Sequence, residues 1–284
     1  MIGRGTNMNK QNKIDRLLTF NLPLLVMLAF TLFPLYWTIN TALKHEGDIV
    51  KRPLGYIPAS PTIDNFVTAW TNVGFSTYFK NSLIVGVCTV LIVLILSTLS
   101  GYALSRYKFK GKRAFLLMLL CTQFIPRSML IIPLFIIFKH LGLISNPLSL
   151  IITYAAVEIP FTTVLMNGFI SSVPRELEEA AMVDGCNKLQ AIRYVIFPLL
   201  VPGIVATSVF TFIYTWNEFL ISLMLTNQQG KFTLPVGLSY MMGEFNINYG
   251  ALAAGSVIAL IPAVLMFAYA QKHLVNGMGG SVKG

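Results

Sequence analysis

The side chains that could carry out chemistry are few and widely separated in this sequence. The three histidines stand at positions 45, 140 and 273, and no HExxH or CxxC spacing is present. Gly111-Lys112 and Gly230-Lys231 are the only Gly-Lys pairs, and both lack the upstream glycine and the following Ser or Thr of a phosphate-binding loop. We therefore predict no catalytic residue, no metal site and no bound cofactor. If ATP drives this protein, another chain must hydrolyse it.

Two charged residues interrupt apolar runs of the sequence. Arg127 lies at the middle of the run 114–138, and Glu158 lies at the middle of the run 147–170. A charge in such a position normally faces a cavity or a partner. Equal depth allows an ion pair between the two side chains, whereas backbone carbonyls, water or another subunit would satisfy each charge separately. The sequence leaves both interpretations open.

The segment 171–194 carries the most specific spacing in the chain. Pro174 suits the first turn of a helix, and acidic residues follow it, where the helix dipole favours negative charge. Gly185 ends this helix, and Asn187 can cap a second one. The pattern predicts two short helices that meet at a glycine. Such a pair can dock in a groove on a partner protein; the alternative is an interfacial helix without a partner.

One face of the first predicted helix carries small and apolar side chains. Leu177, Ala180 and Ala181 fall at positions i, i+3 and i+4, so they share a face. Alanine side chains allow the backbone of another protein to come close. The acidic residues in the early turns are Glu176, Glu178 and Glu179.

The composition indicates that membrane-spanning helices position these residues. Hydrophobic residues make up 55% of the 284-residue chain and charged residues 11%, against about 25% charged in soluble domains, and the mean hydropathy is +0.69. A helix needs about 20 apolar residues to cross a bilayer. We therefore predict an all-α membrane protein with six transmembrane helices. Their ranges are 17–39, 83–104, 114–138, 147–170, 195–225 and 251–270.

The distribution of Lys and Arg predicts the orientation of these helices. The side that holds both termini carries 14 of the 21 basic residues, and the opposite side carries six. By the positive-inside rule, both termini then lie in the cytoplasm. We expect a cytoplasmic tail at 1–16, a transmembrane domain at 17–270 with the cytoplasmic loop 171–194, and a cytoplasmic tail at 271–284. This topology accounts for the net charge of +10, so nucleic-acid binding is not predicted.

Two predicted loops on the outer side are long enough to contact a partner. Residues 43–80 include several prolines and Trp70, and residues 226–250 are polar and contain glycine. Loops of this kind often bind a ligand or another protein. The alternative is that both are solvated connectors.

The motif at 179–198 resembles that of a known family. Glu179-Ala180-Ala181, then Gly185, then Val195-Ile196-Phe197-Pro198 look like the EAA signature of ABC importer permeases. The family prefers Ile at position 195 and Leu at position 197, which are mild apolar departures. Further segments look like the carbohydrate-importer branch and, within it, the MalG-like subunit. They are Ile132-Pro133-Leu134-Phe135, Ile159-Pro160-Phe161, Trp216-Asn217-Glu218-Phe219, Thr233–Leu238 and Gly279–Gly284.

The resemblance implies a permease that moves a sugar, with an oligosaccharide favoured, across the cytoplasmic membrane of a bacterium or archaeon. The partners it implies, besides membrane lipid, are three. They are a second homologous permease forming a heterodimer, an ATPase dimer that binds ATP and Mg²⁺, and an extracytoplasmic solute-binding protein. The alternatives are a secondary transporter or a homo-oligomeric channel for small polar solutes. A membrane-embedded enzyme is disfavoured because no catalytic set clusters in the sequence.

The resemblance also assigns roles to individual residues. The loop 171–194 would form the coupling helix seated in the ATPase, and the tail 271–284 would reach the interface of the ATPase dimer. The residues implied for coupling are Glu179, Ala180, Ala181, Asp184, Gly185 and Pro198. Those implied for contact with the binding protein are Thr233, Leu234, Pro235 and Gly237.

A candidate sugar pathway lies at Trp216, Asn217 and Glu218. These residues combine an aromatic face with polar groups that bind hydroxyls, as in many small-molecule sites. We expect them to line the pathway together with Arg127 and Glu158. The alternative is a structural element at the interface of the two permeases, since the partner permease supplies much of the sugar site in maltose-type importers.

Overall fold

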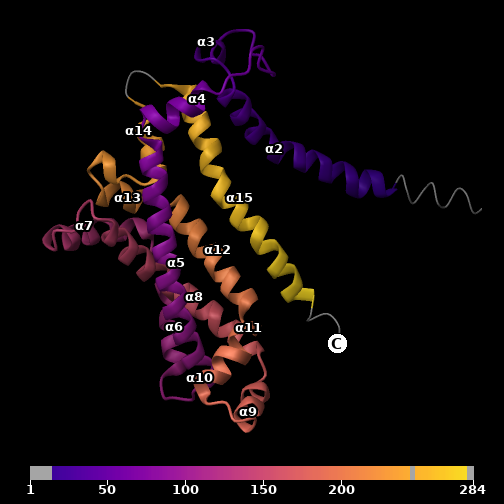
Figure 1. The fold of residues 1–284 in the computed structure, drawn as a ribbon, viewed down its shortest axis with the longest axis vertical. Coiled ribbons are helices and arrows are strands. Elements are labelled where there is room, and N and C mark those ends of the chain that lie inside the picture. The colour runs from indigo at the N-terminus through magenta and orange to yellow at the C-terminus, as the bar shows by residue number, and fades with distance from the viewer. Residues whose placement is uncertain (1–14, 244–246, 280–284) are drawn as a thin grey trace, which may run out of the picture. The chain divides into compact units, whose positions relative to one another are not determined.

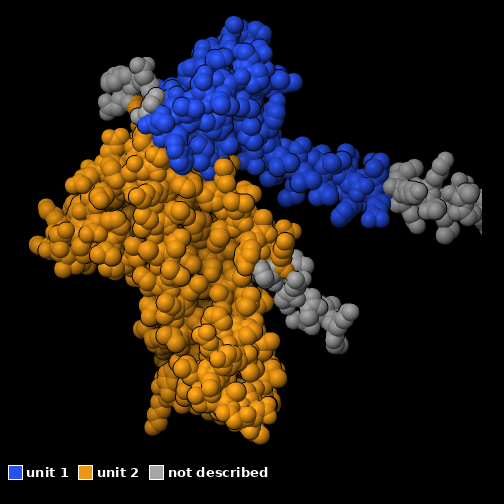
Figure 2. Space-filling model, in the orientation of Figure 1, with its two compact units in different colours: residues 1–72, 244–258 blue, residues 73–243, 259–284 orange. Residues whose placement is uncertain are grey.

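The computed structural model describes residues 15–243 and 247–279, and every regular element in these ranges is a helix. This confirms the prediction of an all-α protein for the described residues. The chain divides into two units, residues 1–72 with 244–258 and residues 73–243 with 259–284 (Figure 2). Most of the predicted N-terminal tail and the end of the predicted C-terminal tail lie outside the described residues.

The first unit contains the first predicted membrane helix and the start of the last one. Its elements are η1 (Leu17–Asn21), α2 (Leu22–Ala42), α3 (Glu46–Ile49), α4 (Asp64–Val67), η2 (Thr68–Asn72) and the first turns of α15 (Tyr249–Gly279). The Glu46 carboxylate accepts hydrogen bonds from the backbone N–H groups of Tyr249 and Gly250, each at 2.9 Å. Negative charge is favoured at this helix N-terminus. None of the apolar window of Leu17–Ala42 is buried within the structure, so lipid or a partner must cover it.

The core of the second unit is formed by three long helices (Figure 1). They are α5 (Phe75–Arg106), α8 (Pro147–Ser172) and α12 (Val201–Asn217). Buried hydroxyl side chains, among them Ser97, Thr162 and Thr211, lie on these helices, and small residues of this kind let helices pack closely. The helix α5 already begins at Phe75, so it takes up the end of the predicted loop 43–80.

Shorter helices complete the second unit. They are α6 (Lys112–Thr122), η3 (Arg127–Leu130), α7 (Ile131–His140), α9 (Arg175–Val183), α10 (Lys188–Ala191), η4 (Ile192–Ile196), α11 (Phe197–Leu199), α13 (Leu220–Leu225), η5 (Gln229–Lys231) and α14 (Leu234–Tyr240). The predicted outer loop 226–250 therefore has helical structure of its own, in η5 and α14.

Four helices of the described chain are continuous, long and apolar enough to cross a membrane. They are Leu17–Ala42, Phe75–Arg106, Pro147–Ser172 and Tyr249–Lys272. Two further candidates are bent pairs. Lys112–Thr122 and Arg127–His140 meet at 91°, and Lys188–Leu199 and Val201–Asn217 meet at 70°. The count reaches the predicted six if each bent pair crosses as one span.

Prolines account for both bends. Pro126 lies between α6 and η3, and Pro202 lies in the first turn of α12. Proline lacks a backbone N–H and clashes with the preceding turn, so a helix tends to end before it. The predicted span 114–138 therefore consists of two helices joined at a bend, and Arg127 lies at the break between them. The predicted helix 195–225 is also divided, since α12 ends at Asn217.

Candidate functional site

The helices α9 and α10 form the pair that the spacing predicts. Gly185 lies between them with a φ of +92°, a left-handed conformation that glycine adopts without strain. Asn187 Oδ1 accepts a hydrogen bond from Gln190 N at 2.9 Å, and Gln190 Oε1 accepts one from Asn187 N at 2.8 Å. This reciprocal cap begins α10. The prediction of two short helices joined at a glycine is confirmed.

The EAA residues divide between a buried and an exposed face of α9. Ala181 is buried, whereas Glu179 and Ala180 are exposed. Of the predicted small apolar face, only Ala181 meets the rest of the unit, because Leu177 is 43% exposed. Asp184 and Gly185 are exposed as well, and Pro198 lies apart from them in α11, close to the bend into α12.

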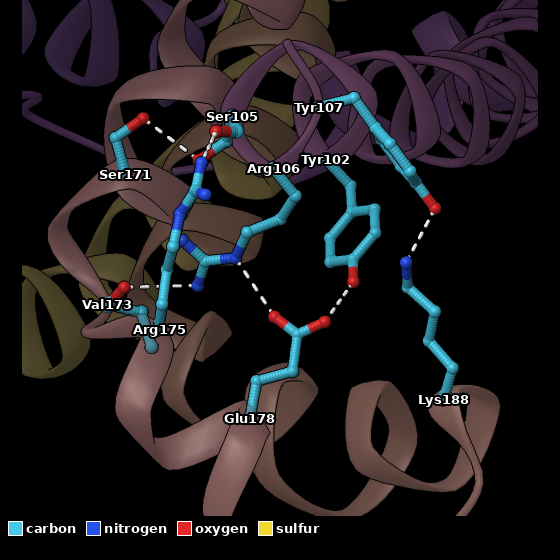
Figure 3. A network of polar contacts seen from close by, with 9 residues as sticks. All are labelled: Tyr102, Ser105, Arg106, Tyr107, Ser171, Val173, Arg175, Glu178 and Lys188. Carbon is cyan, nitrogen blue, oxygen red and sulfur yellow. Dashed lines mark hydrogen bonds and ion pairs between the residues drawn. The ribbon is translucent and has the colours of Figure 1, made fainter. Parts of the chain in front are cut away.

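Polar side chains fasten this helix pair to the end of α5 (Figure 3). Arg106 Nε donates to Glu178 Oε2 at 3.0 Å, and the two side chains are only 7% and 8% exposed. The Tyr102 hydroxyl donates to the other carboxylate oxygen of Glu178. On α10, Lys188 Nζ donates to the Tyr107 hydroxyl at 2.7 Å. Glu178 is therefore held between a cation and a phenol, both carried by α5.

The joint between α8 and α9 is fastened to the same end of α5. Arg106 Nη2 donates to Val173 O at 3.0 Å, and Arg175 Nη2 donates to Ser105 O at 2.8 Å. The hydroxyl oxygens of Ser105 and Ser171 lie 3.0 Å apart. Charged donors on backbone carbonyls make stronger hydrogen bonds than neutral donors do, so the direction of α9 is fixed from α5.

Sequence reasoning selected Glu179 and passed over Glu178, the acid that the structure buries. One signal was available: Glu178 lies three residues before Ala181, so the two share a helix face. That spacing does not reveal which face meets the rest of the protein. The answer depends on Arg106, which lies 72 residues earlier in the chain.

Arg127 and Glu158 come together beside a cavity. Arg127 Nη2 lies 3.5 Å from Glu158 Oε1, and the Arg127 side chain is 51% exposed against 6% for Glu158. The guanidinium carbon lies 4.1 Å from the centre of the Tyr214 ring, within the range of cation–π attraction. Arg127, Tyr214, Asn217 and Glu218 line a cavity of about 490 Å³ that η3, α12 and α13 border, and Glu158 is not among its lining residues.

The Glu218 carboxylate holds the start of α13. It accepts hydrogen bonds from Ile221 N at 2.8 Å, from Ser222 N at 3.1 Å and from the Tyr154 hydroxyl at 2.7 Å. Asn217 is exposed and donates through Nδ2 to Ile213 O at 2.8 Å. Asn217 lines the cavity, and its side-chain amide oxygen is a hydrogen-bond acceptor.

Trp216, the third residue of this predicted group, does not line the cavity. It is 2% exposed, and its indole N–H donates to Ala259 O at 3.0 Å. The rings of Phe79 and Phe212 each lie 5.4 Å from it, centre to centre. Trp216 therefore packs behind the wall to which Asn217 and Glu218 belong.

The residues expected to contact a binding protein are largely buried against α5 and α13. Ser82 Oγ accepts a hydrogen bond from Leu234 N at 2.7 Å, and the Thr233 and Ser222 hydroxyl oxygens lie 2.7 Å apart. A Cβ at Gly237 would lie 2.0 Å from a ring carbon of Tyr78. Only Pro235 of the four expected residues is partly exposed. The neighbouring residues 228–231 are exposed instead.

Comparison with known proteins decides what the chain is. Residues 93–279, more than half of its length, match the family described as "Binding-protein-dependent transport system inner membrane component". The chain belongs to this family. It is a permease subunit of an ABC importer and a multi-pass protein of the cytoplasmic membrane. The alternatives of a secondary transporter and a homo-oligomeric channel are thereby set aside.

Relatives and solved structures of similar length support this assignment. The diacetylchitobiose uptake system permease protein DasC of Streptomyces coelicolor is 38% identical over 93% of this chain and 96% of its own. The arabinooligosaccharides transport system permease protein AraQ of Halalkalibacterium halodurans is 31% identical, over 94% and 96%.

Two solved structures share the fold of the permease. A bacterial ABC transporter for import of the acidic polysaccharide alginate superposes with a TM-score of 0.79 at 23% identity, over 91% of this chain and 96% of that one. A bacterial alginate ABC transporter in complex with a periplasmic protein bound to an alginate pentasaccharide gives 0.66 at 19% identity, over 92% and 94%.

Within the ranges that the structure describes, no three His, Cys, Asp or Glu side chains cluster closely enough to hold a metal ion.

Proposed function

We propose that this permease conducts an oligosaccharide through the cytoplasmic membrane as one half of a heterodimer with a second permease. Relatives over nearly the whole chain carry the names of diacetylchitobiose and arabinooligosaccharide systems. ATP and Mg²⁺ bind to a partner ATPase dimer, and a solute-binding protein delivers the sugar. A structural neighbour was solved with a periplasmic protein that carries a pentasaccharide, which supports the last element of the proposal.

The exposed face of α9 and α10 is the observation that carries the proposal. Both termini and this helix pair lie on the cytoplasmic side in our assignment, as the basic residues indicate. Glu179, Ala180, Asp184 and Gly185 present charge and small side chains to the ATPase. Ala181 fixes the helix from its buried face, and Pro198 lies at the bend through which movement reaches α12.

The cavity beside Arg127 provides the sugar pathway in this proposal. A half-exposed guanidinium over the Tyr214 ring and the Asn217 amide offers hydrogen-bonding groups to sugar hydroxyls. Glu158 orients Arg127, while Glu218 orders the cavity wall and Trp216 supports it from behind.

The outer contact with the binding protein is assigned to residues 228–231, which are exposed. Thr233, Leu234, Pro235 and Gly237 position that segment by packing against α5 and α13. This differs from direct contact through Thr233–Gly237, because three of those four residues are buried.

A mild-detergent purification of the chain from its native membrane tests the proposal. We expect an ATPase, a second six-span permease and a solute-binding protein to be retained and identified by mass. The ligand of that binding protein then names the sugar. Recovery of the chain alone, as a homo-oligomer, under conditions that preserve a known importer complex would contradict the proposal.

A further inference from the structure

Side chains of the helix α5 contact both exposed segments described above, the helix pair α9–α10 and residues 228–231. Figure 1 shows α14 at one end of α5 and α9 and α10 at the other. The helix has 32 residues without a break. At 1.5 Å per residue it extends about 48 Å, which exceeds the hydrocarbon thickness of a bilayer, about 30 Å. It therefore joins one membrane surface to the other as a single rigid body.

The first fastening fixes α9. The chain between α8 and α9 is extended, with ψ angles of 121° at Val173 and 138° at Pro174, so the backbone alone does not continue the direction of α8 into α9. Arg106 closes this joint by bonding both Val173 O and the Glu178 carboxylate. The buried ion pair and the Tyr102 hydroxyl make the direction of α9 depend on α5.

The second fastening fixes the segment that leads into α14. Asn81 Nδ2 donates to Gly230 O at 3.1 Å and to Phe232 O at 3.0 Å. Gln229 Nε2 donates to the Tyr78 hydroxyl at 2.9 Å. Ser82 accepts from the first backbone N–H of α14. Tyr78 and Asn81 therefore hold Gln229 and Gly230 of the exposed segment, and Ser82 holds the start of α14 that follows it.

Two other routes between the two ends are bent, and the unbroken α8 reaches α9 only through the extended joint at Val173 and Pro174. The α6–α7 pair bends by 91°, and the chain from α10 to α12 bends by 70°. A bend at a proline absorbs movement, whereas an unbroken helix displaces both of its ends together. The route through α5 is direct at each end, since its side chains contact the exposed segments themselves.

We propose that α5 transmits the docking of the binding protein at residues 228–231 to α9, with Tyr102, Arg106 and Glu178 as positioning residues. The proposal rests on the function assigned above to the two exposed segments. Docking displaces α5, and the buried ion pair carries that displacement into the direction of α9. The helix pair then meets the ATPase in the arrangement that favours hydrolysis.

The experiment uses the whole importer, reconstituted in lipid nanodiscs with its binding protein, substrate and ATP. The measured quantity is the ratio of the ATPase rate with the loaded binding protein to the rate without it. Glu178→Gln and Tyr102→Phe loosen the end at α9, and Ser82→Ala loosens the end at α14. Thr77→Ala is the matched control, because it removes an exposed hydroxyl from the same first turns of α5.

We expect each of the three variants to lower the stimulation ratio about fivefold and Thr77→Ala to leave it unchanged. Because both ends belong to one link, the double variant Ser82→Ala/Glu178→Gln should be no worse than its worse single variant. Wild-type ratios in the single variants, or a loss in the double variant equal to the product of the single losses, would overturn the proposal. If the Glu178→Gln complex does not assemble, the double variant Tyr102→Phe/Ser82→Ala is compared with its two single variants, and the same outcomes support or overturn the proposal.

A failure of the underlying function has a different signature. In that case the wild-type complex itself would show no stimulation by a loaded binding protein. The charge exchange Arg106→Glu/Glu178→Arg should restore part of the stimulation ratio lost in Arg106→Glu alone, because it rebuilds the ion pair but not the hydrogen bond to Val173 O.

Discussion

Different kinds of interaction hold the two ends of α5. At one end, Arg106 and Glu178 form an ion pair in which both side chains are buried, and Arg106 also donates a charged hydrogen bond to a backbone carbonyl. At the other end, Tyr78, Asn81 and Ser82 make only neutral hydrogen bonds, and Gly237 packs against the Tyr78 ring. A buried ion pair fixes direction, because its strength depends on geometry and on full pairing. Close packing fixes distance, because overlap is resisted from every direction.

This difference matches the tasks proposed for the two ends. The helix pair α9–α10 must keep a defined direction after an extended joint, so a directional contact suits it. The α14 segment lies on the long α5 directly and needs only to stay in place. Substitutions at the two ends should therefore differ in size and in kind.

The largest expected effect is at the ion pair. Glu178→Ala leaves Arg106 buried without a counter-charge, and the free energy of unfolding should fall by about 3–5 kcal/mol. Unfolding of the purified permease in mixed micelles, followed by circular dichroism during an SDS titration, measures this. Glu179→Ala is the matched control, because its exposed side chain should change stability by less than about 0.5 kcal/mol. Equal losses in the two variants would remove the distinction between the ends.

The next effect is expected at the packed end. Gly237→Ala places a methyl group 2.0 Å from a ring carbon of Tyr78, and overpacking of this kind lowers stability by about 2 kcal/mol. Gly168→Ala in α8 is the control, since a Cβ there meets nothing within 4 Å. The same SDS titration compares the two variants. A Gly237→Ala protein as stable as Gly168→Ala would show that Tyr78 moves freely.

A smaller effect is expected at one of the neutral hydrogen bonds of that end, the one that Ser82 accepts. Ser82→Ala removes the acceptor of Leu234 N, a buried contact, and should lower the free energy of unfolding by about 1 kcal/mol. Thr77→Ala serves as its control in the same titration. A loss as large as that of Glu178→Ala would mean that the neutral end is the stronger fastening.

The smallest effect on stability, with a large effect on transport, is expected at the exposed acid. Glu179→Lys should leave the unfolding midpoint unchanged while sugar uptake falls at least tenfold, because its partner lies on the ATPase in our proposal. Uptake of labelled sugar by cells measures transport. ATP hydrolysis by the purified complex measures the action of the ATPase. Glu176→Lys makes the same charge change on the first turn of α9. Normal uptake by Glu179→Lys would contradict the coupling assignment.

Much of the fold followed from local patterns in the sequence. The helix ranges at 83–104 and 147–170 lie within α5 and α8, because a long uncharged run has only one way to satisfy its backbone in lipid. Prolines mark the breaks in 114–138 and 195–225, but the sequence did not show which of its prolines would bend a helix. Proline is also common within unbroken membrane helices, as Pro160 inside α8 shows, so its presence alone does not locate a bend.

The candidate site was predictable only where local sequence determines the structure. The sequence by itself determined the helix pair α9–α10, since the turn at Gly185 and the cap at Asn187 depend only on residues a few positions away. Tertiary structure alone decided that Glu178 is buried and Glu179 exposed. It also placed Trp216 behind the cavity wall and Gly237 against a ring. These outcomes depend on residues tens of positions away, and burial is set by which helix faces meet, which no local spacing encodes.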